Sequence, residues 1–369
     1  MLIIAFCIFP IYILASENKE GTPSSIITND LKQRVDEYSA KYIGTTTTGA
    51  SVIIVKDGKI IVNNSYGYAD LEEKKSVTKN TVFEWGSATK LLVWTSVMQL
   101  VEQGKLNLEE DIREYLPEGF LTKLQYKKHI TMLNLMHHDA GWEESYADIL
   151  STSPASIKPL GETLQNFQPE QVKKPGEVVA YSNYGVALAG YIVERISNQP
   201  FYEYVNDNIF SVLNMKDTAI HPLQADNKEV AKQRKLVHGY EGNNKGKFNR
   251  SKNERIYIGL YPAGSAIGTA EDAARFISAL MPVTGDKSPL FQSNQTLDEM
   301  LTSSKFYNNG LPRNSHGFWQ GMYAVDVLEH AGNTDSFSSN MAFSKKENIG
   351  VIVMTNHPVN LDCAMVYQY

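Results

Sequence analysis

The chain of 369 residues is organised around one stretch, VFEWGSATKLL at residues 82–92. Its pattern predicts a loop that turns into a helix at Ser87, with Lys90 one turn further along on the same helix face. A serine at a helix start lies among unpaired backbone N–H groups, at the positive end of the helix dipole. A neighbouring lysine can accept the serine proton if burial lowers the pKa of the lysine. The spacing therefore indicates a serine nucleophile with a lysine base.

This four-residue spacing is not specific by itself, because it also occurs at residues 16–19 in a polar stretch. The simplest alternative is that Ser87 caps a helix and Lys90 is a solvated helix residue. Residues 91–101 are apolar almost all round, which is typical of a buried helix, and Gly104 then ends the pattern. A lysine in the first turn of a buried helix is costly unless it has a partner or a function. The flanking sequence therefore favours the nucleophile interpretation.

Strand patterns lie near both ends of the chain. Residues 51–63 predict a β-hairpin with a tight Asp-Gly turn, and further strands are expected at residues 321–327, 337–344 and 349–355. The signals between these regions are mainly helical. The sequence therefore predicts an α+β fold. One antiparallel sheet is built from both ends of the chain and flanked by helices, and an all-helical region is inserted.

The same patterns predict the domain organisation. Residues 29–82 and 256–369 form an α/β sheet domain, and residues 83–255 form the helical domain. Residues 1–16 hold an apolar run that is too short for a comfortable membrane span, and we expect a signal peptide or an anchor. Residues 17–28 read as a polar linker. We therefore expect an exported protein, secreted or associated with the cell envelope, with membrane association through the N-terminus left open.

Composition excludes several kinds of partner. The net charge is −6 at pH 7 without a long basic run, so nucleic acid is not an expected partner. The two cysteines, Cys7 and Cys363, would leave one thiol after cleavage of a signal peptide, so we expect no internal disulfide. Glu143 and Glu144 beside His138 make an unconvincing metal site. We expect no metal and no cofactor.

A second candidate motif lies at residues 181–183, on a loop before an apolar helix pattern. The Tyr181 phenol can relay protons, and the Asn183 amide can orient a lysine or a substrate amide. The pattern alone does not single out this site, because Tyr-x-Asn also occurs at Tyr204 and Tyr307.

A third candidate motif begins at His330, on or beside a predicted antiparallel strand. The small residues after it, Gly332 among them, would let a substrate backbone lie along the strand edge. The Asn333 N–H could then join the Ser87 N–H in an oxyanion hole. A lone histidine is more often structural, which is the alternative for His330.

Three motifs, taken in order, resemble those of a known superfamily: SATK at residues 87–90, YSN at 181–183 and HAG at 330–332. Their order and separation resemble the serine β-lactamase/penicillin-binding-protein superfamily, most closely its class C β-lactamase-like branch. That branch includes DD-peptidases, D-aminopeptidases and esterases. Residues 135–141, LMHHDAG, are similar to the family's Leu-Leu-x-His-x-Ser-Gly, and residues 261–272 are similar to its Pro-Ala-Gly stretch.

The resemblance implies a role for each candidate residue. Ser87 would attack a carbonyl group and form an acyl-enzyme, and Lys90 and Tyr181 would share the acid and base work. The positions that would bind substrate are Asn183, His330, Gly332 and Asn333.

One departure from the family pattern bears on the substrate. Many penicillin-recognising enzymes have a lysine where His330 stands, and that cation helps to hold a substrate carboxylate. A neutral histidine does so less well, so we expect inefficient β-lactam hydrolysis. The main hypothesis is an exported serine hydrolase acting on a D-amino-acid peptide or a related amide. The alternatives are an esterase or D-aminopeptidase of the same fold, and a non-catalytic, penicillin-sensor-like binding module.

Overall fold

The computed structural model describes residues 28–144, 150–242, 246–252 and 255–358. The predicted signal peptide, nearly all of the predicted linker and both cysteines lie outside the described residues. Within those ranges no helix is long and apolar enough to cross a membrane.

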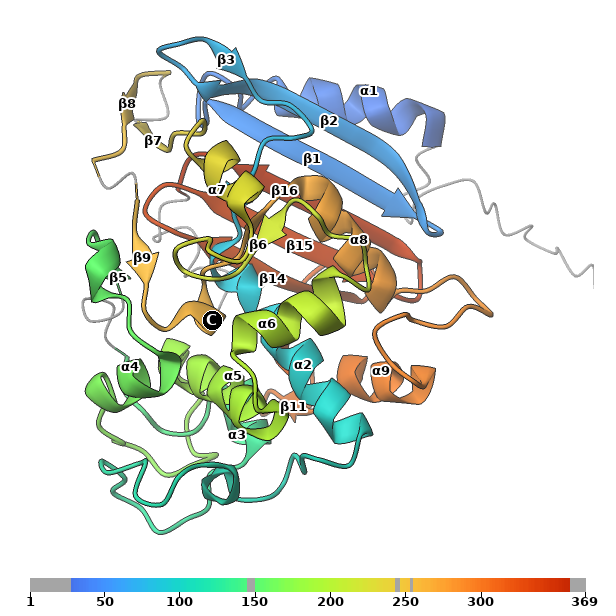
Figure 1. The fold of residues 1–369 in the computed structure, drawn as a ribbon. Coiled ribbons are helices and arrows are strands. Elements are labelled where there is room, and N and C mark those ends of the chain that lie inside the picture. Colours follow the sequence, from blue (N-terminus) through green and yellow to red (C-terminus); the bar gives the residue numbers. More distant parts are fainter. Residues whose placement is uncertain (1–27, 145–149, 243–245, 253–254, 359–369) are drawn as a thin grey trace, which may run out of the picture.

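A nine-stranded sheet forms the main layer of the described structure, in the order β11-β12-β13-β14-β15-β16-β1-β2-β3 (Figure 1). Every neighbouring pair is antiparallel, and β16 joins β1 in a register that places Val353 opposite Val52. The predicted sheet built from both ends of the chain is therefore confirmed. Its strands are β1 (Gly49–Lys56), β2 (Lys59–Asp70), β3 (Lys75–Ser76), β11 (Lys305–Phe306), β12 (Pro312–Ser315), β13 (Phe318–Gly321), β14 (Val327–Asn333), β15 (Ser338–Ser344) and β16 (Ile349–Thr355).

The sequence predicts the turn between β1 and β2 but not the turn between β13 and β14. Asp57 and Gly58 both have positive φ, as a two-residue hairpin turn requires, so the predicted turn between β1 and β2 is confirmed. The strand predicted at residues 321–327 is wrong. β13 ends at Gly321, which pairs with Val327 at the start of β14. The intervening residues must therefore reverse the chain direction and cannot continue a strand.

Helices cover both faces of the sheet. Ile53 and Ile54 in β1 point to opposite faces, as alternate residues of a strand must. Ile54 belongs to the cluster that packs with Leu31 of α1 (Thr28–Ser39). Ile53 belongs to the main core, together with Ile277 of α8 (Ala270–Leu280). β1 is therefore buried on both sides, which explains its continuous apolar run.

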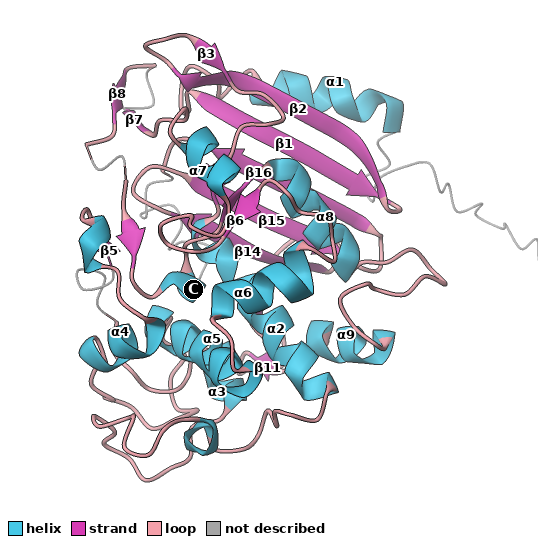
Figure 2. Cartoon of the chain, in the orientation of Figure 1, coloured by secondary structure: helices cyan, strands magenta, loops and turns pink. Residues whose placement is uncertain are grey.

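Most helices of residues 83–255 gather on one side of the sheet, in the lower half of Figure 2. The central helix is α2 (Lys90–Glu102), which packs on α5 (Asn183–Ser197). Every residue of α2 from Lys90 to Leu100 is buried. The predicted buried helix after Ser87 is thus present, beginning as the 3₁₀ turn η1 (Gly86–Thr89). The other helical elements are η2 (Ile112–Tyr115), α3 (Met132–Met136), η3 (Pro154–Ser156), α4 (Leu160–Asn166), α6 (Phe201–Val205), η4 (Asn206–Phe210), α7 (Lys228–Arg234), η5 (Tyr261–Ala263) and α9 (Asn294–Leu301).

Short strands also occur within and beside the region predicted to be helical. β10 (Ile267–Gly268) pairs with both β4 (Phe83–Glu84) and β6 (Thr218–Ala219). The other short pairs are β5 (Leu150–Ser151) with β9 (Tyr257–Ile258), and β7 (Tyr240–Gly242) with β8 (Phe248–Arg250). The β4–β10 pair fixes the chain immediately before Ser87, where the sheet region passes into the helical region.

Candidate active site

Backbone geometry brings Ser87 to the junction between β14 and α2. Gly86 has a φ of 51°, and a Cβ atom there would lie 2.7 Å from the Asn333 backbone nitrogen, so glycine is required. The Thr89 hydroxyl donates to the Gly86 carbonyl at 2.6 Å and accepts from the Ala266 N–H at 3.0 Å. These contacts hold η1 in place on both sides of Ser87.

Lys90 is completely buried, and its Nζ has three oxygen neighbours. It lies 2.8 Å from Ser87 Oγ, 2.7 Å from Asn183 Oδ1 and 2.6 Å from the Ala263 carbonyl oxygen. Burial lowers the pKa of Lys90 to about 7, and the Glu144 carboxylate opposes that shift. Both protonation states of Lys90 are therefore populated near neutral pH.

The partners of Lys90 determine where its lone pair points. A neutral amine has two N–H donors and one lone pair, whereas an amide or backbone carbonyl oxygen only accepts. Asn183 Oδ1 and the Ala263 carbonyl therefore take both N–H groups of neutral Lys90. The remaining lone pair faces the Ser87 hydroxyl, which is the arrangement that a general base needs to remove the hydroxyl proton.

Asn183 is the first residue of α5 and is held by Glu144. The Glu144 carboxylate accepts from the Asn183 backbone N–H at 2.8 Å and from its side-chain Nδ2 at 3.0 Å. Burial raises the pKa of Glu144, and the hydrogen bonds from Asn183 oppose that shift. Spacing in the sequence does not indicate this contact, since Glu144 and Asn183 are brought together only by the path of the intervening chain. From the sequence alone, Glu144 is part of an unconvincing metal site and is not predicted to contact Asn183.

Tyr181 contacts the Lys90 amine and belongs to a stack of aromatic rings. Lys90 Nζ is 4.9 Å from the Tyr181 ring centroid, and the centroid of the His138 ring is 4.5 Å from that of Tyr181. The His138 ring is also nearly parallel to that of Trp319, at 5.6 Å. The Ser182 N–H donates to His138 Nδ1 at 3.1 Å. The stack therefore fixes the Tyr181 ring beside the Lys90 amine.

Two residues of β14 form the sheet side of the site. A Cβ atom on Gly332 would lie 1.8 Å from the Trp85 carbonyl oxygen and 2.9 Å from the Ser87 nitrogen, so only glycine lets the strand approach η1. His330 is buried, with Nδ1 2.7 Å from the Ala331 carbonyl oxygen, so Nδ1 carries the proton and Nε2 has the lone pair. Burial and then the charge of Lys90 lower the pKa of His330 to about 3. His330 is therefore neutral at physiological pH.

Asn333 completes the set of residues brought to this junction. Its side-chain Oδ1 accepts from the Ser338 hydroxyl at 2.7 Å, and its backbone lies beside Gly86. The participation of its N–H in an oxyanion hole stays a prediction. The seven residues that the structure brings together are Ser87, Lys90, Tyr181, Asn183, His330, Gly332 and Asn333. In the described part of the chain, no group of three or more His, Cys, Asp or Glu residues could hold a metal ion.

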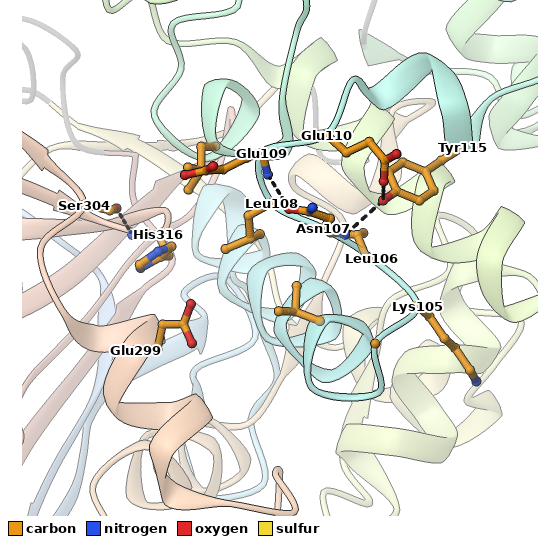
Figure 3. A pocket seen from close by; sticks show the side chains of 13 residues that line it. Lys105, Leu106, Asn107, Leu108, Glu109, Glu110, Tyr115, Glu299, Ser304 and His316 are labelled. Carbon is orange, nitrogen blue, oxygen red and sulfur yellow. Dashed lines mark hydrogen bonds between the residues drawn. The ribbon is translucent and has the colours of Figure 1, made fainter.

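A cavity of 660 Å³ lies at the other end of α2 (Figure 3). It is lined by residues 104–110 and by Tyr115, Glu299 and His316. Lys90 and Val101, which reaches this cavity, are about 16 Å apart along the helix axis at 1.5 Å per residue. Inside it, Tyr115 donates to Glu110 at 2.8 Å. The cavity is therefore separate from the Ser87 site.

A protein-family comparison agrees with this geometry. The model of the Beta-lactamase family matches residues 31–365. The chain belongs to the Beta-lactamase family. The resemblance of the three motifs to the serine β-lactamase/penicillin-binding-protein superfamily is therefore confirmed.

Individual relatives of this Beta-lactamase family member are distant. Protein flp of Staphylococcus aureus (strain N315) is 26% identical over 338 residues, which cover 89% of this chain and 64% of flp. The chain thus spans less than two thirds of the length of that relative. The octameric penicillin-binding protein homologue from Pyrococcus abyssi has a TM-score of 0.74 at 22% identity, covering 89% of this chain and 73% of that one. The D-amino acid amidase from Ochrobactrum anthropi SV3, complexed with L-phenylalanine amide, has a TM-score of 0.70 at 23% identity, covering 89% and 90%. These structural likenesses show a shared fold.

Proposed function

We propose that this chain is a serine hydrolase that acts through an acyl-enzyme on a D-amino-acid peptide or a related amide. One observation carries the proposal: the lone pair of neutral Lys90 faces the Ser87 hydroxyl, because both other neighbours of Nζ are acceptors. A nucleophile within hydrogen-bond reach of its base, in a buried site, is the arrangement that acyl transfer requires.

The reaction proceeds in two halves. Ser87 Oγ bonds to the substrate carbonyl carbon while its proton passes to Lys90 Nζ. The tetrahedral intermediate then breaks its C–N bond, and the leaving amine takes a proton from Lys90, directly or through Tyr181. In the second half, water attacks the Ser87 ester and the same groups return the proton to Ser87 Oγ. The carboxylic acid product then leaves, and the enzyme is regenerated.

The choice of substrate class has two supports. The first is the shared fold with a protein described as a D-amino acid amidase. The second is neutral His330, whose Nε2 has no hydrogen-bond partner among the described residues. This atom offers a lone pair and no charge, so it accepts from an N–H or O–H group and does not attract a carboxylate. The same histidine favours the second candidate, an esterase or D-aminopeptidase, because neither reaction requires a carboxylate beside the scissile bond.

A panel of substrates tests the proposed function. We expect turnover of a D-amino acid amide such as D-phenylalanine amide, with a lower kcat/KM for its L enantiomer and for a peptide ending in a free D-alanine carboxylate. The measurement is amine release under initial-rate conditions. Turnover of p-nitrophenyl acetate alone would favour the esterase candidate. If none of these substrates reacts, the hydrolase proposal fails.

The variant His330→Lys tests the role of the neutral histidine. An ammonium group at this position would form a charge-assisted hydrogen bond to a substrate carboxylate, so we expect kcat/KM for carboxylate-bearing peptides or penicillins to rise about tenfold. The acylation rate with neutral p-nitrophenyl acetate serves as the control and is not expected to rise. An equal change for charged and neutral substrates would contradict the role given to His330.

We also propose that the protein is exported, because the apolar run at residues 2–15 has the length of a secretory signal core. Fractionation of cells that express the full chain with a C-terminal epitope tag tests this. We expect the tagged protein outside the cytoplasm, and its retention in the cytoplasmic fraction would refute export.

A further inference from the structure

Glu144 is an acidic residue whose charge raises the pKa of Lys90, although it belongs to none of the three motifs. It lies just after Trp142, whose backbone bridges to Gln171. Both of its carboxylate oxygens contact Asn183: Oε2 accepts from the Asn183 N–H and Oε1 from Asn183 Nδ2. The Ser182 hydroxyl also interacts with this carboxylate. Asn183 Oδ1 is in turn 2.7 Å from Lys90 Nζ. A continuous hydrogen-bonded path therefore runs from Glu144 to the base.

The other titratable groups around Lys90 do not supply a negative charge. Tyr181 faces the amine from the segment before α5. His138 follows α3 and His330 lies on β14; burial holds the pKa of each well below its usual value, and the charge of Lys90 lowers both pKa values further. Among the described residues, Glu144 is the one group whose charge raises the pKa of Lys90. Its carboxylate is therefore the counter-charge of the site.

We propose that Glu144 is a positioning residue that holds the Asn183 amide with its oxygen toward Lys90, and thereby directs the Lys90 lone pair to Ser87. An asparagine amide has nearly the same shape in its two flipped orientations, so its orientation is decided by its partners. A carboxylate accepts and does not donate, so only Asn183 Nδ2 can face Glu144. The inference rests on the proposed function only in taking Ser87 as the nucleophile.

The flipped orientation shows what Glu144 prevents. With Asn183 reversed, Oδ1 would face the Glu144 carboxylate and Nδ2 would face Lys90. Nδ2 would then donate to the lone pair of neutral Lys90, in competition with the Ser87 hydroxyl. Lys90 would be neutral, but its lone pair would accept from Asn183 Nδ2, so it could not remove the serine proton.

The variant Glu144→Gln tests the inference, because it keeps the size of the side chain and replaces one acceptor by a donor. If the glutamine oxygen keeps the Asn183 N–H, its NH₂ group meets the Asn183 side chain and favours the flipped amide. We expect kcat/KM for acylation by p-nitrophenyl acetate to fall about 10- to 100-fold, the range for a lost hydrogen bond to a charged group. Glu143→Gln is the matched control, since Glu143 is exposed, and it should leave the rate unchanged.

The pH dependence separates this role from general loosening of the site. The rate falls at low pH because Lys90 must be neutral to accept the Ser87 proton, and this fall is the acidic limb of the rate profile. In Glu144→Gln the carboxylate is lost and a donor faces the Lys90 lone pair, so we expect a lower pKa of Lys90. The acidic limb then moves to lower pH. Loosening would admit water and move the limb toward the ordinary, higher lysine pKa. Titration of Lys90 by NMR, with isotope-labelled lysine, measures the same shift without any substrate.

A double variant provides the rescue. In Glu144→Gln/Asn183→Asp, the carboxylate moves to position 183, where one oxygen accepts from Gln NH₂ and the other faces Lys90 in either orientation. We expect at least about tenfold recovery of the acylation rate over Glu144→Gln, and a Lys90 pKa that rises again. An unchanged rate and unchanged Lys90 titration in Glu144→Gln, or no recovery in a folded double variant, would overturn the inference. The predicted shift of Lys90 in a protein that hydrolyses nothing would uphold it and refute the proposed function instead.

Discussion

Replacing Ser87 with alanine is expected to lower kcat/KM on the best substrate by at least about 10³-fold, as for removal of the nucleophile in other serine hydrolases. The physical reason is that the Ser87 hydroxyl is the one that contacts Lys90 Nζ, at 2.8 Å, among the hydrogen bonds of the described residues. The Thr89 hydroxyl is nearest in sequence, but it already donates to the Gly86 carbonyl and accepts from the Ala266 N–H. The measurement is the initial rate of amide hydrolysis by purified wild-type and variant proteins.

A second serine in the same helix provides the control for Ser87→Ala. Ser96 is buried in α2, and its hydroxyl donates to the Leu92 carbonyl at 2.8 Å, away from Lys90. Ser96→Ala should therefore keep the catalytic rate. Full activity in Ser87→Ala, or an equal loss in both variants, would contradict the assignment of the nucleophile.

Replacing Lys90 with methionine should have the second largest effect, also at least about 10³-fold on acylation. Methionine fills the same buried space but has no lone pair of comparable basicity for the Ser87 proton. In the wild type, Lys90 must be neutral to act, and its pKa is about 7. The rate should therefore fall as the pH drops through 7, and this limb should be absent from the residual activity of Lys90→Met.

The profile of kcat/KM against pH for an uncharged amide checks this expectation. Lys105→Met is the matched control, since Lys105 is exposed beyond the other end of α2. It should keep both the rate and the acidic limb. A wild-type rate that is flat across neutral pH, or a Lys90→Met variant that keeps the acidic limb, would show that another group is the base.

Much of the fold could be predicted because it depends on local patterns. The Asp57-Gly58 turn, with positive φ at both residues, is set by those two side chains. The sheet from both chain ends follows from strand patterns at residues 51–63 and 337–355 with helical signals between them. The loop after Gly321 could not be predicted as a turn, because its mixture of apolar and polar residues is compatible with a strand until its antiparallel partner is known.

Part of the candidate site could likewise be predicted from local sequence, and part depends on contacts between distant segments. Ser87 and Lys90 could be predicted because the buried helix that follows them makes an unpartnered lysine costly. The role of Glu144 could not, since its two hydrogen bonds to Asn183 bridge segments whose approach depends on tertiary structure. The stacking of His138 on Trp319 is likewise a contact between distant segments, and no local spacing encodes it.

The central claim is that Ser87 carries the acyl group, and intact mass spectrometry after mixing with an acylating substrate tests it most directly. Purified wild-type protein is quenched in acid at short times after mixing with p-nitrophenyl acetate or a penicillin, beside Ser87→Ala, and digested to locate the adduct. We expect a mass increase equal to the acyl group, confined to the peptide that contains Ser87 and absent from the variant. An adduct on another residue, or one that forms equally in Ser87→Ala, would contradict the claim.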